Sequence, residues 1–185
     1  MNFISVLLIA IGLAMDAFAV SVSAGVKVPK ESKIRTALVM ALVFGFFQAL
    51  MPVIGWIFGT GFAVYIDAWD HWIAFILLFL IGMKMIYEGF SESDEENRDF
   101  TSGAVLLILG IATSIDALAV GFTFAFLDEP ILIPVLVIGL VTFIFSFAGV
   151  ISGEKFRDIL GKKAEIIGGL VLIGIGVKIL IEGLF

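Results

Sequence analysis

Cysteine is absent from this chain, and charged residues are scarce, at 15% of 185 residues. Without cysteine there can be no disulfide, no thiolate metal site and no thiol redox chemistry. The chain has a single histidine, His71, so no pair of histidines can share a metal ion. The net charge of −6 comes largely from one acidic stretch, SESDEENRD at 91–99, which is typical of a solvated loop, so we expect no nucleic-acid partner.

Long apolar runs fill the rest of the chain. Hydrophobic residues make up 61% of it and the mean hydropathy is +1.18, far above the apolar share of soluble domains. A helix needs about 20 apolar residues to cross a hydrocarbon core of roughly 30 Å. Because the runs are long and continuous, the sequence predicts an all-α protein with six transmembrane helices in a lipid bilayer and not a β-barrel. The runs cover roughly 3–26, 36–58, 71–90, 102–127, 131–152 and 164–185.

These runs leave no room for a soluble catalytic domain. We therefore expect no enzymatic activity, no catalytic residues and no cofactor. The first run lacks a basic start and carries Asp16 at its centre, so it is not expected to be a cleaved signal.

Two aspartates lie where charge is most costly. Asp16 and Asp116 each sit near the middle of an apolar run, inside near-copies of one motif, MDAFAVS at 15–21 and IDALAVG at 115–121. A carboxylate costs about 2.5–3.5 kcal/mol at a bilayer centre on insertion scales. Two carboxylates at matching places predict one shared ion site at the midplane; the alternative is a hydrogen bond that packs the two repeats together.

Other segments repeat in the same order. The third and sixth runs contain GMKMIYEG at 82–89 and GVKILIEG at 176–183, and the second and fifth runs each end in a GxxxG that permits close helix approach. Matching glycines are Gly45, Gly55 and Gly59 in one half and Gly139, Gly149 and Gly153 in the other. Each half holds three helices, an odd number, so the second half must be inverted in the membrane. The sequence predicts two inverted repeats, 1–90 and 102–185, joined by an acidic cytoplasmic loop at 91–101, an architecture typical of transporters.

Basic residues gather in two loops. Lys and Arg occur at 27–35 and at 155–163, whereas the loops after the second and fourth runs have none. Because loops rich in Lys and Arg stay on the cytoplasmic side, we expect both basic loops inside and both termini outside.

At these motifs the chain resembles the MntP family of manganese efflux pumps, within the wider lysine-exporter-like superfamily. The resemblance runs from MDAFAVS through GWIFG, HWIAF and IYEGF to TSIDALAVG and GKKAEIIGGLVLIGIGVKIL, nearly the whole chain. It implies a multi-pass exporter of Mn²⁺ in the plasma membrane of a bacterium or archaeon. It also places Asp16 and Asp116 at the family's intramembrane aspartates. Manganese is implied by the resemblance alone, not by composition or spacing.

Neutral oxygen donors supply the other candidate ligands. Ser23 and Thr123 lie seven residues past their aspartates, on the same helix face. Pro52 removes the amide that would bond the carbonyl of Gln48 and favours a kink there. At the matching place the other half has Thr142 and Ser146, and Thr113 and Ser114 carry further hydroxyls. Such groups often hydrogen-bond within or between transmembrane helices, and the kink can equally serve packing. The predicted metal ligands, all oxygen donors that suit Mn²⁺, are Asp16, Asp116, Gln48, Ser23, Thr123 and Thr142.

Two lysine–glutamate pairs form a second predicted group. Lys84 and Glu88, like Lys178 and Glu182, are four residues apart on their helices. Each pair can close an intrahelical bridge that lowers the cost of insertion, or serve coupling and charge compensation. With both aspartates, these four side chains carry a net charge of −2 when all are ionised, the complement of one divalent cation.

The energy source and the rival functions follow from the same residues. No nucleotide-binding segment is present, so we expect export driven by an ion gradient, with protons as the counter-ion. Paired membrane aspartates also occur in intramembrane aspartyl proteases, but MDAF and IDAL lack the Tyr-Asp and Gly-x-Gly-Asp settings expected there. The closer rivals are an exporter of another divalent cation or of a cationic amino acid, and a channel or membrane subunit without coupled transport.

Overall fold

The computed structural model describes residues 3–63, 70–90, 100, 102–156 and 161–184, and these residues form helices and their connections without a β-strand. The helices are α1 (Phe3–Lys27), α2 (Lys33–Ala63), α3 (Asp70–Phe90), α4 (Gly103–Ala112), α5 (Ile115–Phe126), α6 (Leu132–Phe156) and α7 (Gly161–Leu184). The prediction of an all-α fold is confirmed. Of the predicted acidic loop, residues 91–99 and 101 lie outside the described residues.

The helices have the length and apolarity that a bilayer requires. Five stretches are long and apolar enough to cross it, with α4 and α5 together counting as one, Gly103–Phe126. Helix α3 carries a shorter apolar stretch, His71–Tyr87. The chain is therefore a multi-pass membrane protein, with each helix on one of the predicted runs.

The sequence predicted one continuous helix over the fourth run, and this prediction is wrong: the run forms two helices. Helix α4 ends at Ala112 and α5 begins at Ile115. The hydroxyl of Thr113 lies 2.9 Å from the carbonyl oxygen of Leu109, and that of Ser114 lies 2.7 Å from the carbonyl oxygen of Gly110. Side-chain hydroxyls that bond to the preceding turn compete with the backbone ladder and bend helices. The break puts the first turn of α5 inside the membrane-spanning stretch.

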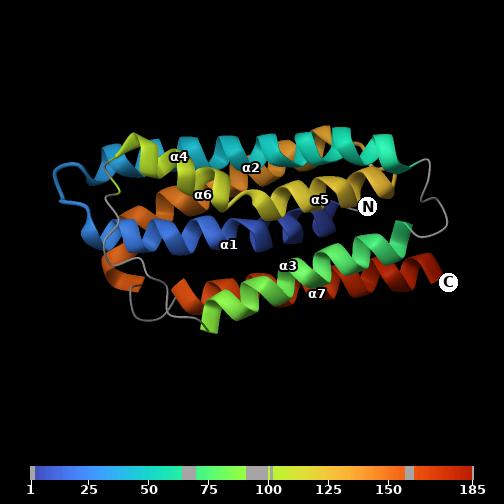
Figure 1. Cartoon of the computed structure of the whole chain (residues 1–185). Helices are drawn as coiled ribbons and strands as arrows, with labels where there is room; N and C mark the ends of the chain where they lie inside the picture. The colour runs from blue at the N-terminus through green and yellow to red at the C-terminus, as the bar shows by residue number, and fades with distance from the viewer. Residues whose placement is uncertain (1–2, 64–69, 91–99, 101, 157–160, 185) are drawn as a thin grey trace.

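The helices lie side by side, as Figure 1 shows, with both chain ends at one end of the bundle and the α1–α2 connection at the other. Helix α1 packs mainly on α6, and α2 packs on α5 and α6. Helices α3 and α7 pack on each other along one side, where α7 also contacts α1 and α3 contacts α5.

Glycines set the closest helix contacts, as the GxxxG pattern predicts. A Cβ added at Gly55 would clash with the backbone of α5 at Leu118, and one added at Gly153 would clash with the backbone of α1 at Val22. These positions need glycine because backbone atoms of the neighbouring helix occupy the place of a side chain.

Candidate functional site

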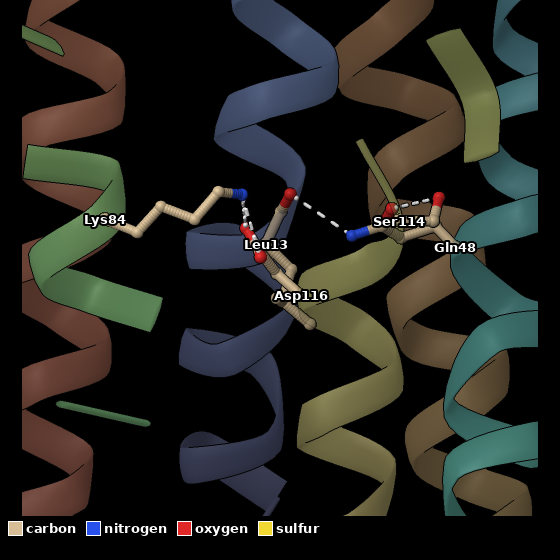
Figure 2. A network of polar contacts seen from close by, with 5 residues as sticks. All are labelled: Leu13, Gln48, Lys84, Ser114 and Asp116. Carbon is tan, nitrogen blue, oxygen red and sulfur yellow. Dashed lines mark hydrogen bonds and ion pairs between the residues drawn. The ribbon is translucent and has the colours of Figure 1, made fainter. Parts of the chain in front are cut away.

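Asp116 is the best-defined charge in the membrane interior. It lies in the first turn of α5 and is only 5% exposed. The ammonium of Lys84, on α3, lies 3.0 Å from its Oδ1 and 3.2 Å from its Oδ2. Figure 2 shows the lysine reaching across from α3 to this carboxylate. The ion pair offsets the cost of burying the carboxylate, which is large for an uncompensated charge.

Gln48 ties three helices together beside this pair. Its Nε2 donates to the carbonyl oxygen of Leu13 on α1 at 3.3 Å, and its Oε1 lies 2.8 Å from the hydroxyl of Ser114, just before α5. Gln48 is fully buried on α2, and Figure 2 shows its amide directed at this junction. The Oε1 atom keeps a second lone pair, so the amide can position α5 and still bind a cation.

Asp16 occupies the matching place on α1, which is continuous there. The residue is half-buried and its Oδ1 is buried. Thr142 and Ser146 lie one turn apart on α6, the main neighbour of α1. Their hydroxyl oxygens are buried and have no hydrogen-bond partner among the described residues. An unsatisfied buried hydroxyl costs free energy that a bound cation can recover.

The remaining predicted ligands differ in their surroundings. Thr123 is buried and its hydroxyl bonds back to the carbonyl oxygen of Ala119 at 3.3 Å, whereas Ser23 is half-buried. The described residues contain no group of three or more His, Asp or Glu side chains placed to hold a metal ion together. The ligand role of each predicted residue therefore stays a prediction.

The two lysines have different partners. Lys178 lies 3.6 Å from Glu182, the predicted intrahelical pair, and its ammonium is also 3.1 Å from the hydroxyl of Ser5 on α1. Lys84 makes an ion pair between helices, with Asp116, which the spacing of four residues did not indicate. The side chain of Glu88 lies outside the described residues. Sequence reasoning also missed the break before α5, although the hydroxyls of Thr113 and Ser114 were visible signals.

Fold and site define a class: a helical, multi-pass membrane protein whose interior holds a carboxylate paired with an ammonium from another helix. Comparison with known proteins gives the family. A family model described as "Putative manganese efflux pump" (Mntp) matches residues 31–180. The chain belongs to this family, whose members are transporters and not enzymes, and the resemblance seen in the sequence is confirmed.

Individual relatives are similar to this chain along nearly its full length. The chain is 50% identical to "Putative manganese efflux pump MntP" of Clostridium perfringens (strain 13), covering 98% of this chain and 95% of that protein. It is 51% identical to the protein of the same name in Crocosphaera subtropica, covering 100% and 98%. It is 49% identical to that of Methanosarcina mazei, covering 98% and 97%. No solved structure matches the chain.

Proposed function

We propose that this protein exports Mn²⁺ from the cytoplasm of a prokaryote by alternating access, with Asp16 and Asp116 as the central ion site. The observation that carries the proposal is a buried carboxylate, Asp116, held at the membrane interior by an ammonium that is itself a cation on a flexible chain. A site that holds one cation through a reversible ion pair can exchange it for another. The names of the relatives supply manganese as the substrate.

An inverted repeat supports alternating access, because exchanging the two halves then converts one state into the other. The packing of the inner helices fits such a repeat. Gly59 on α2 faces Phe122 and Ala125 on α5, and Gly153 on α6 faces Val22 and Gly25, the residues of α1 at the matching places. The pair α2 and α6 meets through Gly45 and Gly139, which also match.

The donor set suits a hard divalent cation. The proposed donors are the carboxylates of Asp16 and Asp116 together with amide and hydroxyl oxygens, and the chain has no thiol. Oxygen ligands of this kind suit Mn²⁺ and exclude soft-metal selectivity. In this scheme Asp16 and Asp116 supply charge, and Gln48, Thr142, Ser23 and Thr123 supply neutral oxygens.

Protons are the counter-ion that the site favours. An inward-negative membrane potential opposes expulsion of a cation by about 2.3 kcal/mol per charge per 100 mV, so export needs a driving gradient. A buried carboxylate can carry either a metal or a proton. Antiport then returns the carrier with protonated carboxylates, while Lys84 and Lys178 offset whichever acidic groups, including Glu88 and Glu182, remain charged. The same scheme has the basic loops inside and both termini outside.

The proposal is tested by removing each charge with little change of shape. Asp16→Asn and Asp116→Asn should each abolish Mn²⁺ flux in proteoliposomes that contain only this protein. Ser21→Ala is the matched control on α1, since the Ser21 hydroxyl is not among the predicted ligands and bonds back to the carbonyl oxygen of Ala17 at 2.6 Å, and it should retain most of the flux. Native flux in either aspartate variant would reject the proposed site.

A second substrate class is favoured by one observation. The ammonium of Lys84 already fits the carboxylate of Asp116 at 3.0 Å, so a cationic amino acid could present the same group. Competition decides between the two: excess lysine should leave Mn²⁺ flux unchanged if the metal is the substrate, and should suppress it if the amine is.

A further inference from the structure

Helices α3 and α7 form one unit, which we call the arm, beside α1, α2, α5 and α6, which we call the core. Within the arm the two helices run antiparallel in a register that the repeat preserves. Gly82 on α3 faces Gly169 and Ile173, and Gly176 on α7 faces Phe75 and Leu78 near the other end. Gly82 and Gly176 are matching residues of the two halves.

The arm does not sit symmetrically on the core. On one side Lys84 of α3 meets Asp116 of α5. On the other side the matching lysine, Lys178, meets Ser5 of α1 and not Asp16, the match of Asp116. Ser5 lies 11 residues before Asp16, about 16 Å along the helix at 1.5 Å per residue. The two symmetry-related contacts therefore differ in register by far more than a lysine side chain alone spans.

Further contacts support both registers. His71 at the start of α3 lines a hollow with Leu127 and Glu129, just beyond the end of α5, which agrees with Lys84 meeting Asp116. Gly12 on α1 faces Leu172 on α7, which agrees with Lys178 meeting Ser5. In Figure 1 the arm is displaced toward the end of the bundle that carries the termini, with the end of α7 reaching beyond the start of α1.

Helix geometry indicates how the arm could slide along the core to remove this offset. Eleven residues are close to three turns at about 3.6 residues per turn, so Ser5 and Asp16 lie on the same face of α1. Gly12 lies between them on that face and offers no side chain to obstruct a passing helix. Because α3 and α7 are antiparallel, one slide away from the termini brings Lys178 toward Asp16. The same slide takes Lys84 from Asp116 toward Val105, the match of Ser5.

We propose that the arm has a second position on the core, shifted by about three helical turns away from the termini, in which Lys178 pairs with Asp16 and Lys84 has left Asp116. Lys84 is thus a counter-ion of Asp116 in the described position, and Lys178 is a counter-ion of Asp16 in the shifted position. A cation that displaces Lys84 from Asp116 frees the arm to move, and the pair between Lys178 and Asp16 holds it in its new place. This inference rests on the proposed function and on its inverted repeat.

Paired cysteines test the movement, since the native chain has none. Leu8 and Ile175 line one hollow with Lys178 in the described position. Ala19 lies 11 residues beyond Leu8 on the same face of α1. In proteoliposomes a short thiol cross-linker should join Ile175→Cys to Leu8→Cys in one variant and to Ala19→Cys in another. Failure of either pair to cross-link in a protein that elutes as the native form would overturn the proposal.

Charge variants make the test specific to the lysines. Lys84→Met should raise the yield of the Ala19 pair at least threefold and lower that of the Leu8 pair, and Lys178→Met should do the reverse. Lys84→Arg, which keeps the charge, should leave both yields near native. Shifts in the same direction for both methionine variants would indicate a merely structural role and refute the exchange. Cross-linking does not depend on Mn²⁺ flux, so opposite shifts in a protein that moves no Mn²⁺ would support the arm movement and reject manganese as its substrate.

Discussion

Replacing Lys84 with methionine is expected to tighten Mn²⁺ binding, because the lysine ammonium competes with the metal for Asp116. Methionine keeps much of the length of the side chain and removes the charge. The ammonium lies 3.0 and 3.2 Å from the two carboxylate oxygens, so a metal ion that uses either oxygen must displace it. If Mn²⁺ binds at Asp116, its affinity for the native protein is therefore lower by the free energy of this ion pair.

The size of the effect follows from burial. A hydrogen bond to a charged group contributes about 1.5–3 kcal/mol. The side chain of Lys84 is 44% exposed whereas that of Asp116 is 7% exposed, so we take the lower end, about 1.5 kcal/mol. This corresponds to roughly a tenfold lower Kd. Without metal the variant should melt at a lower temperature than the native protein, because a buried carboxylate has lost its partner, and saturating Mn²⁺ should restore the melting temperature.

Equilibrium dialysis of the purified protein at pH 8 measures the affinity, and thermal melting with and without Mn²⁺ measures the stability. Lys84→Arg is the matched control and should bind within about threefold of the native protein, since the charge remains. If Lys84→Met folds and binds Mn²⁺ no more tightly than the native protein, the lysine does not compete with the metal, and the proposed role of the ion pair is wrong.

Three further predictions address packing, topology and coupling. Gly55→Ala should destabilise the fold by about 1–3 kcal/mol, because the added Cβ would clash with the backbone of Leu118. The control is Gly61→Ala, whose Cβ would have nothing within 4 Å and which should melt like the native protein. Equal melting temperatures for the two variants would contradict the close contact at Gly55. A cysteine added after Phe185 should react with an impermeant thiol reagent from outside the cell and one at Glu31 only from inside, and the reverse pattern would invert the topology. A pH gradient imposed on proteoliposomes at a clamped membrane potential should drive Mn²⁺ against the proton flow; Mn²⁺ flux that ignores the gradient and moves no protons would leave a uniporter or another coupling ion.

The helices were largely predictable, because the length of an apolar run is a local property of the sequence and must match the thickness of the bilayer core. All six runs correspond to helical stretches, and the GxxxG segments at Gly55–Gly59 and Gly149–Gly153 lie at close helix contacts as expected. Glycine spacing is informative here since it marks where another backbone must approach. The inverted relation of the halves stays a prediction that this packing supports.

The site was less predictable. The pair of Lys84 with Asp116 depends on how α3 lies along α5, a tertiary register that spacing within one helix does not encode. The hydroxyls of Thr113 and Ser114 were only a weak signal of the break before α5, since the same kind of hydroxyl leaves other helices intact. Thr142 and Ser146 sit in an unbroken α6, although Thr113 and Ser114 mark the end of α4. Adjacent hydroxyls that both bond back to the preceding turn distinguish the broken helix, and that is visible only in the folded chain.

The break between α4 and α5 makes the two aspartates chemically unequal. Asp116 sits in the first turn of a helix, where the backbone dipole favours a negative charge by about 0.3–1 kcal/mol. Asp16 sits within the continuous α1 and has no such help. If both aspartates bind the ion at one central site, as proposed, a carrier with such unequal ligands has different half-saturating concentrations on its two faces. Equilibrium constrains only the ratio of forward to backward flux, so under the proposed function one interrupted helix would let transport be fast in the outward direction at cytoplasmic metal levels and slow in the other.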